Sequence, residues 1–202
     1  MAKYNKTLFC ICGETASGKD TLTSRLINEY PDQFKAVCSH ASRPMRDGEV
    51  DGREHYFITK EEFKKLKEEN EGHIIAYTHI ASKDGEGYEY MALESELETS
   101  NIYVIDYNGI KFLKEHFQDK IENIVVIYIT APLQDRIQRA STRSDFKSAF
   151  KKRVMNEFEQ FLDLNLSSEY DYIIPNLNNS GDIPYEVLTL IVSNYVELKK
   201  RV

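Results

Sequence analysis

Residues 13–21, GETASGKDT, have the composition and spacing of a loop that binds phosphate. Gly13 and Gly18 permit a tight backbone path, and the N–H groups at the start of a following helix attract an anion. Lys19 would reach the terminal phosphates of a nucleotide, and Thr21 would add a hydroxyl group. Asp20 stands where such loops carry Ser or Thr, so a carboxylate would take the place beside a metal ion. A plain strand–helix turn is the alternative explanation.

Arginines gather in two places downstream. Arg43 and Arg46 flank a proline in a polar loop, where two guanidinium groups on a stiffened backbone suit bidentate capture of a phosphate. Segment 134–153 carries seven Lys and Arg against two Asp, a local charge of +5. A basic arm near bound phosphates would stabilise charge during phosphoryl transfer. Solvated arginines on the surface are the competing explanation in both places.

Asp106 lies at the end of an apolar run, in the sequence VIDYNG. The carboxyl ends of parallel strands are where open α/β sheets bind ligands, so Asp106 would hold metal-bound water or contact a substrate. An Asp at this point would equally cap the next helix.

The chain alternates between strand and helix patterns around these groups. This alternation predicts an α/β domain with three layers, α/β/α, and a mostly parallel central sheet. The polar, turn-rich block 40–98 differs enough from the rest to be an inserted subdomain. Strands are predicted at 7–12, 35–39, 56–58, 73–79, 88–90, 102–106, 124–130 and 172–174, and helices at 20–30, 60–70, 91–98, 134–166 (with a break near 141–148) and 185–201.

Composition narrows the class of protein. The 202 residues are 41% hydrophobic, which is sufficient for one domain with a substantial core. A net charge of −7 does not favour binding to nucleic acid, and no apolar run is long enough to cross a bilayer, so we expect neither as a partner. The sequence has three cysteines and no CxxC pair: Cys10, Cys12 and Cys38. We expect them to be buried free thiols of a protein in the reducing cytoplasm, and not metal ligands or redox groups.

The motifs occur in the order found in guanylate kinases, and the resemblance extends over nearly the whole chain. The block at 42–57, SRPMRDGEVDGREHYF, is similar to the GMP-binding signature of that family. VIDYNG resembles its strand-end aspartate, and EYDYIIPN at 169–176 resembles its last strand. The resemblance implies a P-loop kinase with a core (1–39, 99–133 and 157–202), a nucleoside-monophosphate-binding subdomain (40–98) and a lid (134–156).

The resemblance also implies an activity, the phosphorylation of GMP by ATP to give GDP and ADP, with Mg²⁺ bridging the ATP phosphates. Catalytic roles would fall on Lys19, Arg43, Arg139, Arg143 and Arg153. ATP would contact Gly13, Glu14, Thr15, Ala16, Ser17, Gly18, Lys19, Asp20, Thr21 and Asn176. The monophosphate would contact Ser39, Ser42, Arg43, Arg46, His55, Tyr56, Tyr88, Tyr90 and Asp106, and the metal Asp20 and Asp106.

The sequence departs from the family pattern where the base is read. His55 stands at the position of a phosphate-binding tyrosine, although Tyr56 is adjacent. No acidic residue occurs at 74–75, where the family's guanine-reading glutamate falls, and Tyr88-Glu89-Tyr90 replaces a Tyr-Gly-Ser/Thr element. A kinase for another nucleotide or phosphorylated metabolite, or a non-catalytic binding module, is therefore an alternative function. The chain would act as a monomer or a homodimer.

Overall fold

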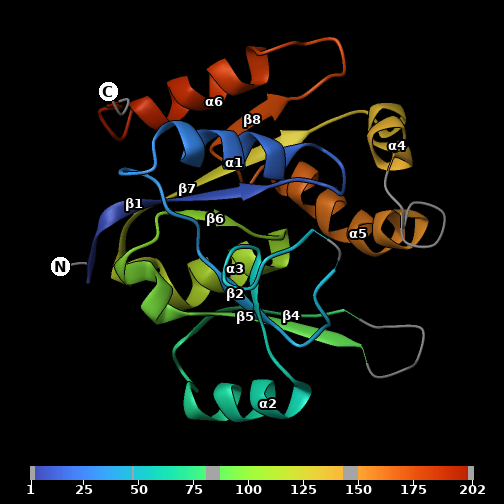
Figure 1. Ribbon diagram of the computed structural model, residues 1–202. Coiled ribbons are helices and arrows are strands. Elements are labelled where there is room, and N and C mark those ends of the chain that lie inside the picture. Colours follow the sequence, from blue (N-terminus) through green and yellow to red (C-terminus); the bar gives the residue numbers. More distant parts are fainter. Residues whose placement is uncertain (1–2, 47, 81–86, 143–149, 200–202) are drawn as a thin grey trace.

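In the part of the chain that the structure describes, two four-stranded sheets form the framework (Figure 1). The computed structural model describes residues 3–46, 48–80, 87–142 and 150–199. The first sheet is entirely parallel, with the order β6-β1-β7-β8: Ile102–Val104, Tyr4–Cys12, Ile121–Thr130 and Tyr172–Pro175. The second sheet is mixed, with the order β3-β2-β5-β4: His55–Phe57, Ser39–Ala41, Tyr88–Leu93 and Ile74–Ile80.

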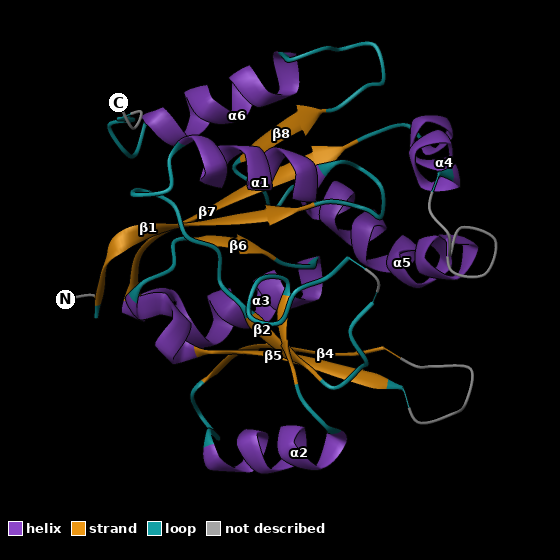
Figure 2. Ribbon diagram, in the orientation of Figure 1, coloured by secondary structure: helices purple, strands orange, loops and turns teal. Residues whose placement is uncertain are grey.

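Helices cover both faces of the parallel sheet (Figure 2). On one face, α1 (Lys19–Glu29) and α6 (Ile183–Ser193) pack against Phe9 and Ile11 of β1. On the other face, α3 (Tyr107–Phe117) and α5 (Lys151–Ser167) pack against Leu8 and Cys10. Because β1 is buried on both faces, it reads as a nearly continuous apolar run and not as an alternation. The predicted three-layer α/β/α fold with a mostly parallel sheet is confirmed.

The second sheet lies against α3, on the side of that helix away from the parallel sheet. Ile75, Ala76 and Ala92 of this sheet belong to the same buried cluster as Ile110 and Leu113 of α3. The helix α2 (Lys60–Glu69) covers the outer side of the second sheet (Figure 1). The remaining helices are α4 (Leu133–Ser141) and the 3-10 turns Glu94–Glu98 and Gln118–Lys120.

Three predicted elements differ from the structure. The expected strand at 35–39 makes one isolated bridge, Ala36 to Ile102, because the chain leaves the parallel sheet there and forms β2 in the second sheet. The expected helix at 91–98 is instead the end of β5 and a 3-10 turn, since pairing of Met91 with His40 and Tyr77 overrides local helix propensity. The last helix ends at Ser193, well before residue 201.

Two expectations from the sequence concern the state of the cysteines and the presence of a membrane-spanning helix. Cys10, Cys12 and Cys38 are free and buried. Burial raises the pKa of each thiol above its usual value, which makes these thiols unreactive. Within the described residues, no helix has the length and apolar character to span a membrane.

Glu94 joins three separate parts of the chain. Its side chain is 4% exposed and lies 2.9 Å from Lys3 Nζ, 2.8 Å from His73 Nδ1 and 3.2 Å from Lys120 Nζ. Burial alone would raise the pKa of Glu94, but hydrogen bonding with Lys3, His73 and Lys120 lowers it to about 2. The ionised carboxylate therefore ties the amino terminus and the second sheet to the 3-10 turn that follows α3.

We expect Glu94→Gln to reduce the dependence of stability on pH. The pKa of Glu94 is below its ordinary value of 4.5 in the folded chain, so its stabilising effect is present above pH 4.5 and is lost as the pH falls towards 2. Because solvent screens the partly exposed basic partners, we expect the ionised carboxylate to contribute about 1–2 kcal/mol to the free energy of unfolding. Urea unfolding near pH 7 and near pH 3 measures this difference. Equal losses of stability in the wild type and the variant would contradict it.

Candidate active site

The loop between β1 and α1 has a backbone path that requires both of its glycines. Gly18 has a φ of +93°, and a Cβ atom there would collide with the side-chain amide of Asn176. A Cβ atom on Gly13 would collide with the carbonyl oxygen of Ile129, on the neighbouring strand β7. A hydrogen bond of 3.0 Å from Ser17 N–H to the Glu14 carbonyl closes the turn between them. The first residue of α1 is Lys19, so the start of this helix meets the loop as predicted.

Arg139 and Asn176 hold the loop in place through its carbonyl groups. Arg139 Nη1 donates to the Ser17 carbonyl at 2.9 Å, and its Nη2 donates to the Asn176 carbonyl at 2.7 Å. Asn176 Nδ2 also donates to the Ser17 carbonyl, at 2.8 Å, and Arg139 Nε donates to Asn178 Oδ1 at 2.9 Å. The resemblance assigned Arg139 to catalysis and Asn176 to ATP binding, and the structure brings both to the loop, where they fix its shape.

Lys19 and Asp20 lie side by side at the start of α1. Lys19 Nζ is 3.5 Å from Asp20 Oδ2, with side chains 20% and 72% exposed respectively. Asp20 is thus free to approach a solvated metal ion, and its carboxylate is a ligand type that Mg²⁺ accepts. Thr21 follows on the exposed side of the helix. No cluster of three or more metal-ligating side chains occurs in the part of the chain that the structure describes.

Two acidic side chains lie at the loop, one from α5 and one from the loop itself. Glu157 of α5 accepts a hydrogen bond from Thr15 N–H at 2.7 Å. Glu14 lies 3.4 Å from Arg136 Nη2 and accepts a hydrogen bond from Tyr128 Oη at 3.1 Å. Burial raises the pKa of Glu157, although the Thr15 N–H group and the charge of Lys19 act in the opposite direction. Sequence reasoning did not find Glu157, because its contact joins residues 142 positions apart.

Arg43 is buried, and its guanidinium group is already occupied. Nη1 and Nη2 each donate to Glu49 at 2.6 Å, in a bidentate pair. Nη1 also donates to the Pro44 carbonyl at 2.9 Å, and Nε donates to Tyr90 Oη at 3.0 Å. One N–H bond of Nη2 is left for a further acceptor. Arg43 therefore has a structural role in addition to the predicted contact with phosphate.

Arg46 is exposed in the same loop, and its backbone N–H donates to Glu49 at 2.8 Å. Partial desolvation lowers the pKa of Arg46, and the charges of Arg43 and Arg153 lower it further. Arg153 belongs to α5, so the fold brings this helix to the Arg43–Arg46 loop. Arg143, a further predicted catalytic residue, lies outside the described residues.

A cavity of about 200 Å³ lies between the second sheet and the end of β6. Two hydrogen-bonded pairs line it: Ser39 Oγ with His55 Nδ1 at 2.8 Å, and Thr78 Oγ1 with Asp106 Oδ2 at 3.0 Å. Asp106 Oδ1 also accepts from Gly109 N–H at 2.7 Å, so this residue both caps α3 and lines the cavity. The rest of the lining includes Ala76, Tyr90, Met91 and Tyr103.

The remaining predicted substrate residues fall in different places. His55 lines the cavity, whereas Tyr56 points to the other side of β3 and packs on His40 with ring centroids 5.0 Å apart. Ser42 Oγ accepts a hydrogen bond from Glu89 N–H at 2.8 Å and is buried. The side chain of Glu89 accepts a hydrogen bond from Tyr77 Oη at 2.6 Å and lies 3.7 Å from Lys67 Nζ, and Glu89 is not among the residues that line the cavity. The half-buried Tyr88 begins β5.

The phosphate loop on a parallel sheet with helices on both faces defines a P-loop nucleotide-binding fold. The guanylate kinase family profile matches residues 5–194. A guanylate kinase of Chlamydia trachomatis serovar D is 30% identical over 189 residues, covering 91% of this chain and 85% of the relative. A guanylate kinase of Campylobacter jejuni serotype O:2 is 28% identical over 194 residues, covering 94% and 88%.

The crystal structure of guanylate kinase from Anaplasma phagocytophilum has the same fold, with a TM-score of 0.62 at 20% identity. The superposition covers 98% of this chain and 90% of that one. The chain belongs to the guanylate kinase family, a family of phosphotransferases. The resemblance inferred from the sequence motifs is confirmed.

Proposed function

We propose that the chain transfers the terminal phosphoryl group of ATP to GMP, giving ADP and GDP, in the cytoplasm. One observation carries the proposal: α5 places Arg153 near Arg46 and, one turn further on, Glu157 on the loop that contains Lys19. The two groups proposed to bind phosphate, the loop with Lys19 and the loop with Arg43 and Arg46, would thus both meet α5, about one helical turn apart. A phosphate oxygen of GMP would attack the terminal phosphorus of ATP, and the bond to the ADP oxygen would break.

The residues act mainly by position and charge. Lys19 and the backbone N–H groups of the loop would bind the ATP phosphates, while Arg46, Arg153 and the remaining N–H of Arg43 would bind the GMP phosphate. Asp20 would hold a Mg²⁺ ion, which would supply positive charge against the ATP phosphates. Asp20 suits this ion better than Asp106, because both oxygens of Asp106 already accept hydrogen bonds. Block 40–98 would be the substrate-binding subdomain.

The lid proposed at 134–156 shares a helix with the core. Helix α5 is continuous from Lys151 to Ser167, so it crosses the boundary at residue 156. Motion of the lid would therefore carry Arg153 and Glu157 together. Arg143 would act from the same segment, and closure would keep water from the phosphoryl group in transfer.

A panel of nucleoside monophosphates with ATP and Mg²⁺, read as ADP production, tests the activity. Turnover with GMP alone supports the proposal. Turnover with a different monophosphate would support the second candidate, a kinase for another base, which is favoured by the apolar Ala76 and Met91 in the cavity. Binding of ATP without turnover of any monophosphate, and loss of that binding in Lys19→Ala, would indicate a binding module.

We expect Asp20→Ser to make ATP binding less dependent on Mg²⁺. Without the metal, the Asp20 carboxylate repels the ATP phosphates, by about 4 kcal/mol at 4 Å and an effective dielectric of 20, and solvent screening of this exposed group reduces that figure. The wild type should therefore gain about tenfold more affinity from Mg²⁺ than the variant. Calorimetric titration of ATP with and without Mg²⁺ measures this ratio. The same gain in both proteins would rule out the metal-side role.

We expect Glu157→Gln to bind ATP more tightly than the wild type. The amide oxygen can still accept the Thr15 N–H bond, but the negative charge beside the phosphate loop is removed. The gain should be about tenfold for ATP and smaller for ADP, which has one phosphate fewer. Because burial raises the pKa of Glu157, the wild type should approach the variant's affinity as the pH falls and the carboxylate is protonated.

Glu159→Gln is the matched control, because Glu159 lies on the exposed side of the same helix. Its affinity for ATP should equal that of the wild type. If Glu157→Gln and Glu159→Gln change ATP affinity alike, the loop contact has no specific effect on the nucleotide.

A further inference from the structure

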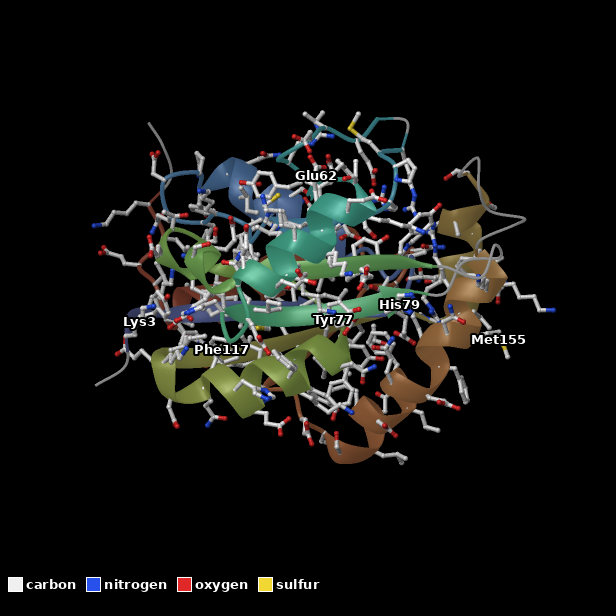
Figure 3. The ribbon with its side chains drawn as sticks, turned by 90° about the horizontal axis from the view of Figure 1, so that it is seen from below. Lys3, Glu62, Tyr77, His79, Phe117 and Met155 are labelled. Atoms are coloured by element: carbon white, nitrogen blue, oxygen red, sulfur yellow. The ribbon has the colours of Figure 1, made fainter. Side chains whose placement is uncertain are left out.

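Two hydroxyl groups in the cavity between the second sheet and β6 each have a fixed hydrogen-bond partner. Ser39 Oγ lies 2.8 Å from His55 Nδ1, and these two residues are opposite each other on the paired strands β2 and β3. Thr78 Oγ1 lies 3.0 Å from Asp106 Oδ2. Thr78 belongs to β4 and follows Tyr77, which Figure 3 shows on this strand. Both pairs line the cavity, so both hydroxyl groups can contact a bound base.

The direction of the Thr78 hydroxyl follows from its partner. An ionised carboxylate can only accept hydrogen bonds, so Thr78 donates its proton to Asp106. The lone pairs of the Thr78 oxygen are left for a ligand, from which this hydroxyl can accept a hydrogen bond but to which it cannot donate one. Asp106 Oδ1 also accepts from Gly109 N–H at 2.7 Å, which holds the carboxylate at the start of α3.

The direction of the Ser39 hydroxyl depends on the protonation of His55. When the imidazole is neutral, Nδ1 can accept the Ser39 proton, and Ser39 then presents lone pairs to the cavity. When the imidazole is protonated, both ring nitrogens are donors. Nδ1 then donates to Ser39 Oγ, and the Ser39 proton turns towards the cavity. One proton on His55 therefore changes Ser39 from an acceptor into a donor.

The groups around the imidazole of His55 favour its neutral form. Those that face it are Arg43, Arg46 and Glu49 of the loop after β2, the Ser39 carbonyl of β2, and Tyr90 of β5, whose ring centroid is 5.4 Å away. Burial lowers the pKa of His55 below its ordinary 6.5, and the two arginines lower it further, whereas Glu49 and the Ser39 carbonyl act in the opposite direction. Asp51 forms a backbone bridge with His55, but its carboxylate accepts from Phe57 N–H at 2.8 Å. Near pH 7 the ring is therefore neutral, and Ser39 faces the cavity as an acceptor.

We propose that Ser39 and Thr78 accept hydrogen bonds from the N–H groups of guanine, and that His55 is the positioning residue that keeps Ser39 an acceptor. The Watson–Crick edge of guanine has two donor groups, N1–H and the 2-amino group, whereas adenine has one donor, the 6-amino group, and one acceptor, N1. Two hydroxyl acceptors fit guanine and replace the carboxylate that the sequence lacks at 74–75. Protonation of His55 leaves one acceptor and one donor, which fits adenine. This inference rests on the proposed function, since it takes a monophosphate to occupy the cavity.

Calorimetric titration of the chain with GMP and with AMP, without ATP and at several pH values from about 8 to about 5, tests this inference. The ratio of the two dissociation constants cancels the ionisation of the phosphate and its attraction to a charged His55, because both ligands carry the same phosphate. In the wild type, the preference for GMP should fall about tenfold as the pH falls through the pKa of His55, which proton NMR measures on the same sample. A preference for GMP that is constant across that pKa would overturn the role of His55.

Two variants separate the hydrogen bond of His55 from its contribution to the fold. His55→Asn places an amide oxygen near the position of Nδ1 and does not titrate, so its preference for GMP should be the same at every pH. His55→Phe has no acceptor and should have the lower preference at every pH. The matched control is His40→Asn, because His40 is a half-buried histidine of β2 whose pKa is also lowered by burial, but it packs on Tyr56 and is not in the cavity lining. Its pH profile should be that of the wild type, and the wild-type profile in His55→Asn would contradict the inference.

Removal of the two hydroxyl groups tests their contacts with the base without a change of pH. Ser39→Ala and Thr78→Val should each lower the preference for GMP about tenfold at pH 8, and in Ser39→Ala the preference should no longer depend on pH. A wild-type preference in both variants would overturn this inference and leave the proposed function intact. Equal affinity of the wild type for GMP and AMP at pH 8 would overturn both the inference and the choice of GMP as the substrate.

Discussion

Replacing Lys19 with Met is expected to lower kcat by about three orders of magnitude while leaving the free energy of unfolding nearly unchanged. Lys19 is the first residue of α1, and its ammonium group is the one positive charge in the loop itself. Its nearest charged partner is the exposed carboxylate of Asp20, at 3.5 Å. Removing the amine therefore leaves no buried group without a partner, and the loss appears in the chemical step.

The measurement is steady-state ADP production with GMP and Mg²⁺-ATP, together with urea unfolding. Lys65→Met is the matched control, because Lys65 is 75% exposed on α2 and pairs only weakly with Glu69, at 3.7 Å. It should keep the wild-type kcat. A Lys19→Met variant within tenfold of wild type would mean that Lys19 does not contact the transferred group.

The phosphate loop could be predicted from the sequence because all its determinants are local. A strand, two glycines and a helix start follow one another within 18 residues, and no distant contact is needed to recognise them. Gly13 and Gly18 are further restricted by Ile129 of β7 and by Asn176, which directly follows β8. The sequence indicated that these two positions need glycine, but it could not indicate which atoms a Cβ atom there would collide with.

The second sheet was predicted less well, because its strands are short and depend on partners. β2 and β3 have three residues each, which is too few for the alternation of apolar and polar side chains along a strand to be recognised. Residues 91–93 have good helix formers, yet they complete β5 because β4 pairs beside them. The prediction of the long parallel strands needed no knowledge of neighbours where they are apolar on both faces, at 7–12 in β1 and 124–130 in β7, but it missed the first three residues of each strand, which are partly polar.

In the candidate site, the sequence identified residue types better than their partners. Arg139 was expected to act on phosphate, but its guanidinium group binds the Ser17 and Asn176 carbonyls. Glu157 was not expected at all, since a glutamate on an amphipathic helix usually faces solvent. Asp106 was predicted as a helix cap or a ligand-binding residue; the structure shows the cap on α3 and places the side chain in the lining of the cavity, and its contact with a ligand stays a prediction.

The buried pair of Arg43 and Glu49 leads to the second large expected effect. Arg43→Met should destabilise the chain by about 3 kcal/mol, because removal of one partner leaves the other charge poorly solvated. The side chains of Arg43 and Glu49 are 5% and 17% exposed. Tyr90 Oη would also lose the hydrogen bond that it accepts from Arg43 Nε. For a chain of this length the loss corresponds to a fall in Tm of roughly 6–12 °C.

Two controls separate this pair from ordinary surface charges. Arg53→Met removes an exposed pair in the same loop, with Glu54 at 2.6 Å and side chains 59% and 35% exposed. It should cost less than about 1 kcal/mol. Arg43→Met combined with Glu49→Leu should cost less than the sum of the two single changes, because neither charge is then left alone. Additive losses would show that the two side chains stabilise the loop independently.

The same pair predicts how the stability of this loop depends on pH. Hydrogen bonding to Arg43 lowers the pKa of Glu49 from 4.5 to about 2. Its stabilising effect is therefore fully present above pH 4.5 and is lost as the pH falls towards 2. Arg43→Met should remove this part of the acid sensitivity, and Arg53→Met should not. Because Arg43 also lies beside Arg46, kcat/KM for the monophosphate should fall in Arg43→Met even at a temperature where the variant is fully folded.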